Sequence, residues 1–286
     1  MVIFHDPRCA EYSTPGHPER PERITQTVPV LKDRHPDWEW REPQPAKERN
    51  LFRAHTRDHV EQIKNAAQDF DADTPAYPRI YDYAISSAGA GIEAAQAALA
   101  GKRAFSLMRP PGHHATRDHA MGFCYFSNIA IAALAALDSG VERVAIWDFD
   151  AHHGNGTEAI VANNPRIRFA SVHQFPAYPG TGAHSFANID NYPVAPNMPR
   201  AEYANAIERA LQKLTLSKPQ LLLVSAGFDG YARDPLVQMT LEREDFATFG
   251  EWLRQIDIPG AAILEGGYSN DLPELIDAFL TSWAGQ

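Results

Sequence analysis

Two aspartates and two adjacent histidines lie within six positions of the stretch VAIWDFDAHHGNGTE, residues 144–158. The stretch follows an apolar run and precedes two glycines, so these ionisable groups stand where a strand should pass into a loop. In extended backbone Asp148, Asp150 and His152 alternate and project to one side, with neighbours in this row roughly 6.5–7 Å apart at Cα. Two such side chains can converge on one ion.

A third oxygen ligand is available from Asp229 in the segment AGFDG. Three protein ligands of nitrogen and oxygen type, with one position left open, are typical of a catalytic zinc rather than a structural one. The alternative interpretation is a polar turn whose aspartates cap a helix that begins near residue 155, because aspartate is common before helices.

Similar clusters of His, Asp, Tyr and Gly follow the other expected strands. Because ligands of α/β proteins bind outside the carboxyl ends of parallel strands, we expect the clusters to lie together at one edge of a sheet. Taken alone, His113 and His114 could instead be a buried structural pair. The clusters are RPPGHHA (109–115), DFDAHHGNG (148–156), HQFPAYPGTG (173–182), GFDGYARDPL (227–236) and EGGY (265–268). Histidines expected to be structural or solvated are His5, His35, His55, His59 and His184.

The elements that must position these residues alternate between short apolar runs and helical patterns. The runs are continuously apolar, as expected of strands that are covered on both faces. This order predicts one α/β domain over residues 1–286, with a mostly parallel sheet and helices on both faces. The expected strands are 1–4, 103–108, 143–149, 167–172, 220–226 and 260–264, and the expected helices are 81–99, 127–138, 200–215, 242–255 and 271–283.

The composition narrows the function classes. A formal net charge of −10 disfavours non-specific nucleic-acid binding and favours a small or cationic substrate. No apolar run approaches the roughly 18 residues that span a membrane, and the first residues lack the pattern of a signal peptide. Only two cysteines occur, Cys9 and Cys124, so no disulfide framework or cysteine-rich zinc site is available, which suits the cytoplasm.

Seven motifs occur in an order that resembles the zinc-dependent histone deacetylase superfamily, which includes bacterial deacetylase-like proteins and acetylpolyamine amidohydrolases and shares its fold with arginases. The resemblance implies that fold, one Zn²⁺ per chain with Fe²⁺ or Co²⁺ as possible substitutes, and an acylated lysine or acetylated polyamine as substrate. The motifs are GHPERPER (16–23), RPPGHHA, GFCYFSN (122–128), DFDAHHGNGT, YPGTG (178–182), AGFDGYARDPL and LEGGY (264–268).

Position by position, the resemblance implies roles for residues at the expected sheet edge. His113 and His114 match the tandem active-site histidines, and Tyr268 matches the tyrosine that hydrogen-bonds the substrate carbonyl. Asp148 matches the carboxylate behind the first histidine, and Asn155 stands behind the second, where family members differ between Asp and Asn. The implied zinc ligands are Asp150, His152 and Asp229.

Other positions match the family's substrate tunnel and a structural ion site. Phe123, next to Gly122, and Tyr178 match the aromatic walls of the tunnel, and Asp73 falls near the aspartate of its rim. Leu236 stands where one polyamine-specific branch carries a glutamate. The resemblance also implies a structural K⁺ near Asp148, Asp150, His152 and Ser171.

These residues provide what amide hydrolysis requires. A metal polarises the carbonyl and activates water, histidines carry protons, and a tyrosine meets the oxyanion. We therefore predict a zinc-dependent enzyme that deacylates lysine side chains, with an acetylpolyamine amidohydrolase as the closest alternative. An arginase-like binuclear hydrolase is disfavoured because Gly154 stands where that group requires an aspartate. An inactive protein that binds acylated ligands is disfavoured because the ligands and Tyr268 are all present. The oligomeric state is left open.

Overall fold

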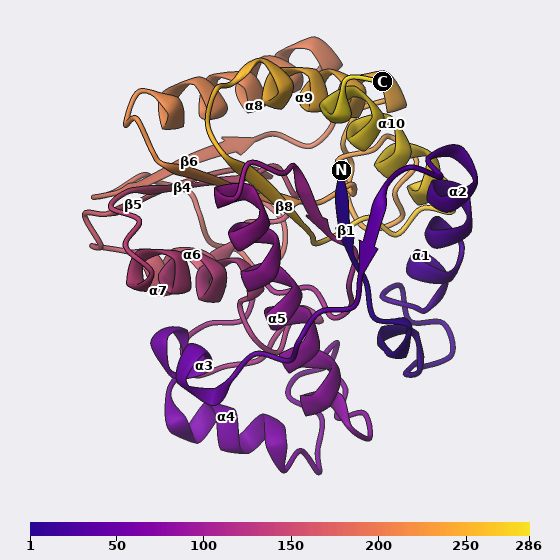
Figure 1. Cartoon of the computed structure of the whole chain (residues 1–286), viewed down its shortest axis with the longest axis vertical. Coiled ribbons are helices and arrows are strands. Elements are labelled where there is room, and N and C mark those ends of the chain that lie inside the picture. Colours follow the sequence, from indigo (N-terminus) through magenta and orange to yellow (C-terminus); the bar gives the residue numbers. More distant parts are fainter.

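The continuously apolar runs of the sequence form the centre of one eight-stranded sheet in a computed structural model that describes residues 1–286 (Figure 1). The strands are β1 (Val2–Phe4), β2 (Glu39–Arg41), β3 (Ala104–Ser106), β4 (Val144–Asp148), β5 (Ile167–Gln174), β6 (Ile189–Val194), β7 (Leu221–Ala226) and β8 (Gly260–Leu264). Every pair is parallel, and the order across the sheet is β2-β1-β3-β8-β7-β4-β5-β6.

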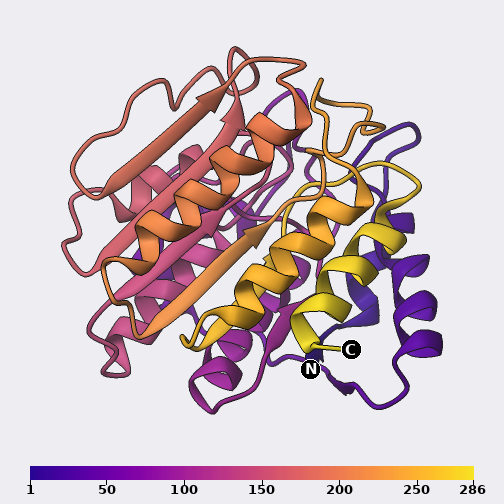
Figure 2. The same ribbon diagram turned by 90° about the horizontal axis from the view of Figure 1, so that it is seen from above.

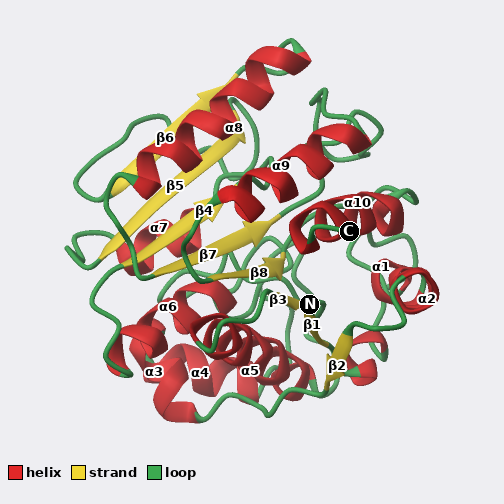
Figure 3. Ribbon diagram, turned by 45° about the horizontal axis from the view of Figure 1, so that its top comes forward, coloured by secondary structure: helices red, strands yellow, loops and turns green.

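Helices cover both faces of this sheet, which confirms the predicted α/β class. They are η1 (Pro7–Ala10), α1 (Glu22–Thr25), α2 (Thr27–Arg34), α3 (Glu48–Ala54), α4 (Arg57–Lys64), α5 (Ile80–Leu99), α6 (Asn128–Asp138), α7 (Asn155–Val161), α8 (Arg200–Thr215), α9 (Arg243–Gln255) and α10 (Leu272–Ala284). α8, α9 and α10 lie side by side over one face, as Figure 2 shows, and α5 and α6 cover the other, as Figure 3 shows. None of these helices combines the length and the apolar character that a membrane-spanning segment requires.

The five predicted helices end within one residue of their expected bounds because their local signals are strong. α5 is rich in alanine, the best helix former, and buries most of its length. α9 begins with a capping box between Glu242 and Asp245, and α10 ends at Gly285 in the left-handed conformation. These signals are contained within each helix, so sequence alone locates them.

The sequence prediction missed the strands at both edges of the sheet. β6 reads IDNYPV, and its polar residues and proline do not resemble a buried strand. An edge strand pairs on one side only, so Pro193 is tolerated there although it cannot donate a hydrogen bond. β2 is three residues long, and its first and last residues are exposed, which leaves no apolar run to find. The short helices α1 to α4 were missed as well, whereas α7 begins at Asn155, where the capping alternative expected a helix to start.

Candidate active site

The polar clusters that follow the strands meet at one edge of the sheet, as predicted. β3, β8, β7 and β4 are neighbours in the sheet, and their carboxyl ends lead into the two tandem histidines, the EGGY segment, the AGFDG segment and the DFDAHH segment. The loop after β5 adds Tyr178 from the next strand along. Residues far apart in sequence therefore share one crevice, where α/β sheets bind their ligands.

The DFDAHH segment is not extended beyond Asp148, which corrects the strand predicted for 143–149. The Asp150 backbone N–H donates to Asp148 Oδ1 at 3.1 Å, and the His152 N–H donates to Asp150 Oδ1 at 2.9 Å. Such local bonds compete with strand pairing and turn the chain at the sheet edge. The capping alternative is wrong, because Gly154 precedes α7 and no side chain caps that helix.

Three buried side chains could hold a cation here: Asp150, His152 and Asp229. One ligand atom from each lies within 4.8 Å of the others, and His152 Nδ1 is 3.3 Å from Asp150 Oδ1 and 2.6 Å from Asp229 Oδ2. Neither carboxylate forms an ion pair with a Lys or Arg side chain. Burying two carboxylates that are not paired with a Lys or Arg side chain lowers the free energy of unfolding. A bound divalent metal would offset that cost, so this donor set fits such a metal.

The two carboxylates also favour the protonated form of His152. Burial lowers the pKa of His152, but the carboxylates of Asp229 and Asp150 outweigh it and raise the pKa to about 10. Burial and the charge of Asp150 raise the pKa of Asp229 to about 7. A bound metal would have to displace the proton of this pair.

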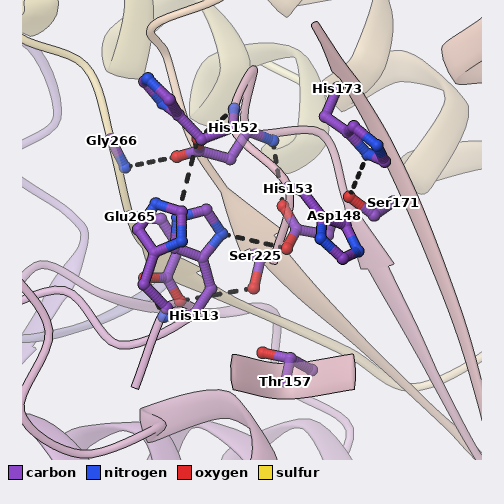
Figure 4. A network of polar contacts seen from close by, with 12 residues as sticks. His113, Asp148, His152, His153, Thr157, Ser171, His173, Ser225, Glu265 and Gly266 are labelled. Carbon is purple, nitrogen blue, oxygen red and sulfur yellow. Dashed lines mark hydrogen bonds and ion pairs between the residues drawn. The ribbon is translucent and has the colours of Figure 1, made fainter. Parts of the chain in front are cut away.

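His113 lies next to Asp148 (Figure 4), and its other ring nitrogen faces Asp150. Its Nδ1 donates to Asp148 Oδ2 at 3.1 Å, and its Nε2 lies 3.7 Å from Asp150 Oδ1. Burial lowers the pKa of His113, but Asp150 and then Asp148 outweigh it and raise the pKa to about 10. His113 is therefore held in the protonated form near neutral pH.

His114 has the opposite electrostatic character. Asn155 Oδ1 lies 2.8 Å from His114 Nδ1, and since an amide oxygen only accepts, Nδ1 carries the hydrogen and Nε2 keeps a free lone pair. Burial, followed by the positive charges of His113 and His152, lowers the pKa of His114 well below its usual value. His114 is thus neutral, and it lines the cavity where His113 does not.

The start of α7 brings Asn155 to this place. The N–H groups of Gly156 and Thr157 both donate to the His113 carbonyl oxygen at 3.0 Å, which fixes the first turn of the helix against the tandem histidines. A Cβ at Gly156 would lie 2.5 Å from the His114 carbonyl carbon, so only glycine permits this approach.

A cavity of about 380 Å³ opens over these groups. All five residues predicted to contact substrate are on its wall, together with three of the predicted catalytic or metal-binding residues.

Phe123, one of these wall residues, has a backbone in the left-handed region at φ 68°, and its N–H donates to Thr74 Oγ1 at 3.0 Å. The lining is His17, Pro18, Asp73, His114, Gly122, Phe123, His152, Tyr178, Leu236 and Tyr268. A wider groove of about 910 Å³ adjoins its mouth and shares His17, Pro18, Leu236 and Tyr268.

Tyr268 is held at the cavity by contacts on three sides. Its ring meets Phe123 edge-on at 5.7 Å and lies 4.9 Å from the Arg23 guanidinium, and its backbone N–H donates to Asp234 Oδ2 at 2.7 Å. Gly267, at φ 113°, makes the turn that points the ring inward. Burial raises the pKa of Tyr268 well above its usual value, so the phenol keeps its hydrogen and can donate it.

Two buried carboxylates that support the site were not singled out from sequence. Glu265 Oε2 accepts from the N–H groups of Gly112 and His113 at 2.7 and 3.1 Å, which fixes the turn of the tandem histidines. Asp234 accepts from the N–H groups of Tyr268 and Leu236. Both stand inside motifs noted above, LEGGY and RDPL, but a motif does not say which backbone groups a carboxylate will bind.

Comparisons with known proteins agree with this geometry. The family model described as "Histone deacetylase domain" matches residues 17–282. The chain is 42% identical to an uncharacterised protein of Synechocystis sp., with 96% of this chain and 95% of that protein covered. It is 37% identical to the histone deacetylase-like amidohydrolase of Pseudomonas aeruginosa, with 89% and 73% covered.

Two solved structures share the fold over nearly the whole chain. The HD domain of HDA15 superposes with a TM-score of 0.94 at 28% identity, covering 100% of this chain and 91% of that one. The acetylpolyamine aminohydrolase of Burkholderia pseudomallei superposes with a TM-score of 0.91 at 25% identity, covering 99% and 98%.

Proposed function

The chain belongs to the histone deacetylase domain family, and from this premise we propose that it hydrolyses an acetyl or another short acyl group from the side chain of an N-acylated lysine. The observation that carries the proposal is the cavity in which His114, His152 and Tyr268 meet behind walls of Phe123 and Tyr178. A lysine side chain has an apolar stem that such aromatic walls can contact, with the amide at its tip reaching the floor.

We assign Zn²⁺ as the metal of Asp150, His152 and Asp229, because two oxygens and one nitrogen leave a position open for substrate or water. Fe²⁺ or Co²⁺ could occupy the same ligands. When bound, such a metal polarises the substrate carbonyl and lowers the pKa of water. The structure offers no second group of three His, Cys, Asp or Glu for a binuclear centre, and a Cβ at Gly154 would clash with Asp148 Oδ2.

In this proposal His114 carries the proton. Its neutral imidazole, with Nδ1–H held by Asn155, presents Nε2 to accept a proton from the attacking water. The imidazolium formed in that way can pass the proton to the departing amine, since the same ring faces the cavity throughout. His113, protonated beside Asp148 and Asp150, contributes positive charge beneath the reacting amide.

Tyr268 supplies the donor for the oxyanion of the tetrahedral intermediate. Its phenol stays protonated, and its backbone is held by Asp234, so the donor needs little reorganisation during the reaction. Asp148 sets the tautomer and orientation of His113 by accepting from Nδ1.

We further propose that a structural K⁺ lies near Asp148, Asp150, His152 and Ser171. Ser171 is the register partner of Asp148 across the β4–β5 pair, so backbone oxygens from both strands are close by. We also propose that residues 1–286 form one catalytic domain, because a single sheet and one hydrophobic core of 80 buried residues extend through the chain. The cytoplasmic location stays a prediction from cysteine content.

An acetylpolyamine is the second candidate substrate, because the structural relative from B. pseudomallei is named for that activity. Asp73 is the only acidic residue that lines the cavity, and Leu236 offers no charge to a distal amine. An acylated lysine side chain has no second amine beyond its amide and needs no further carboxylate in the wall. The lining of the cavity therefore fits an acylated lysine better than an acetylated polyamine.

A substrate panel tests the choice. Acetyl-lysine peptides, acetylputrescine and acetylspermidine are compared at equal metal loading, and we expect kcat/KM to be highest for the peptides. The Leu236→Glu variant should raise the ratio of polyamine to peptide turnover, because it adds a carboxylate at the wall. Leu236→Gln is the matched control: glutamine has the size of glutamate but no charge, so this variant should leave the ratio unchanged. Activity confined to polyamines in the unsubstituted chain would overturn the lysine assignment.

A further inference from the structure

His153 follows the metal-binding His152 but takes no part in the site described above. Its side chain is buried and bridges two elements: Nε2 lies 3.0 Å from Glu158 Oε2, and Nδ1 lies 2.7 Å from Thr181 Oγ1. A carboxylate only accepts, so Nε2 donates to Glu158, and Nδ1 is left to accept from the Thr181 hydroxyl. One imidazole thus joins α7 to the loop that follows β5.

Glu158 is a fixed anchor for this bridge. It lies on α7, and the same Oε2 atom accepts from Asn191 Nδ2 at 2.7 Å. Asn191 belongs to β6, the edge strand of the sheet. The hydrogen bond to His153 is therefore held between a helix and a strand, and Thr181 is tied through it to the rigid part of the fold.

A second histidine binds the next residue of the loop. His173 Nε2 donates to the Gly182 carbonyl oxygen at 3.1 Å, while its Nδ1 accepts from Ser171 Oγ at 2.9 Å, the contact visible in Figure 4. Gly182 is at φ 83°, and a Cβ there would clash with both His153 and His173. The close approach of the loop to the two rings thus depends on glycine.

Tyr178, three residues before Thr181, depends on this attachment. Its ring forms an edge contact with His114 at 5.2 Å and lines the cavity, yet its hydroxyl makes no hydrogen bond and the residue is 40% exposed. The loop is also held at its start, where the Phe175 N–H donates to the Val194 carbonyl at 2.8 Å. Because Tyr178 has no polar contact of its own, the backbone on either side sets where its ring stands.

We propose that His153, held by Glu158, is a positioning residue that acts through Thr181 to fix Tyr178 in the wall of the cavity. In this way it sets the affinity of the cavity for an acyl-lysine side chain. This role rests on the function proposed above. It predicts a loss in substrate binding rather than in the chemical step, because the wall contacts the substrate stem and not the reacting atoms.

The test uses Thr181, which is exposed, so that substitution removes its bond to His153 and spares the buried bond between His153 and Glu158. Thr181→Val removes the hydroxyl at nearly constant volume, and Thr181→Ser keeps it. With an acetyl-lysine peptide, we expect Thr181→Val to lower kcat/KM about three- to tenfold, the range of one lost hydrogen bond, through a higher KM. Thr181→Ser should match the unsubstituted chain. In a Tyr178→Ala background, Thr181→Val should have no further effect, because the residue it positions is gone.

Equal losses from Thr181→Val in both backgrounds, or no loss in either, would overturn the proposal. Hydrogen exchange at the Gly180 amide, which donates to the Ala177 carbonyl at 2.8 Å inside the loop, gives a readout without catalysis. Exchange should quicken about three- to tenfold in Thr181→Val and not in Thr181→Ser, and unchanged exchange would also count against the role. If the unsubstituted chain hydrolyses no acyl-lysine peptide, the proposed function fails, and the exchange result still decides whether the loop is held as described.

Discussion

Replacing Asn155 by aspartate should move the acid limb of the pH–rate profile upward. Asn155 offers His114 an acceptor without a charge, at 2.8 Å from Nδ1. Asn155→Asp keeps the acceptor at almost the same place and adds a negative charge behind the ring. If His114 is the proton acceptor, the charge must change the pH range over which the enzyme works.

The size of the effect follows from the distance. Charge centres about 4 Å apart interact with about 4 kcal/mol at an effective dielectric constant of about 20, which corresponds to about three pKa units. Burial of the new carboxylate will reduce this gain, so we expect a rise of about two units. The same chain contains a comparable case, since Asp150 and then Asp148 raise the pKa of His113 to about 10.

In the unsubstituted chain the pKa of His114 lies well below 6.5, so the ring stays neutral across the usual assay range. A raised pKa means that His114 binds a proton at higher pH, and an imidazolium cannot accept another. Activity of Asn155→Asp should therefore fall as pH drops through the new pKa, while activity at pH near 9 is retained.

The assay is kcat/KM for an acetyl-lysine peptide between about pH 5.5 and 9.5, at saturating metal. Asn155→Ala is the matched control, because it removes the acceptor without adding charge and should lower the whole profile without moving its acid limb. An active Asn155→Asp enzyme whose acid limb coincides with that of the unsubstituted chain would refute the assignment of His114.

Three further predictions concern the proposed oxyanion donor Tyr268, the carboxylate that holds its backbone, and the proposed metal site. Tyr268→Phe should lower kcat about 10²- to 10³-fold with little change in KM, measured in steady-state kinetics. Asp234→Asn places an amide donor against one of the two backbone N–H groups that Asp234 accepts from. It should lower the free energy of unfolding by about 1–3 kcal/mol, measured with denaturant, and should also lower kcat. Asp257→Asn, at an exposed position without hydrogen bonds, should change neither quantity. Metal affinity should rise about tenfold per pH unit between about pH 8 and 9.5, because in this range, above the Asp229 pKa of about 7, the proton that must leave is the one His152 holds below its pKa of about 10. Chelator competition measures this affinity, and a pH-independent affinity would contradict the prediction.

The sequence was sufficient to predict which residues meet, because parallel strands bring their carboxyl ends to one edge. His113, Asp150, Asp229 and Tyr268 follow four different strands, and no knowledge of strand order was needed to expect them together. The helices were also accessible, since alanine content and capping residues act within a few turns.

What the sequence could not show depends on contacts between distant segments. That β8 lies between β3 and β7, and so places Glu265 under the tandem histidines, is a property of the whole sheet. The bend after Asp148 arises from side chains that bind their own backbone, which strand periodicity does not register. The bridge from His153 to Thr181 likewise requires the loop after β5 to fold back over α7.

A zinc titration of metal-free protein shows whether Asp150, His152 and Asp229 form one catalytic metal site. Hydrolysis of an acetyl-lysine peptide is measured as zinc is added, beside an Asp229→Ala variant that lacks one of the three proposed ligands. We predict that activity rises in proportion to zinc, reaches its plateau at about one equivalent per chain, and stays absent in the variant. A plateau near two equivalents, activity without metal, or an active Asp229→Ala variant would contradict a mononuclear metal site formed by Asp150, His152 and Asp229.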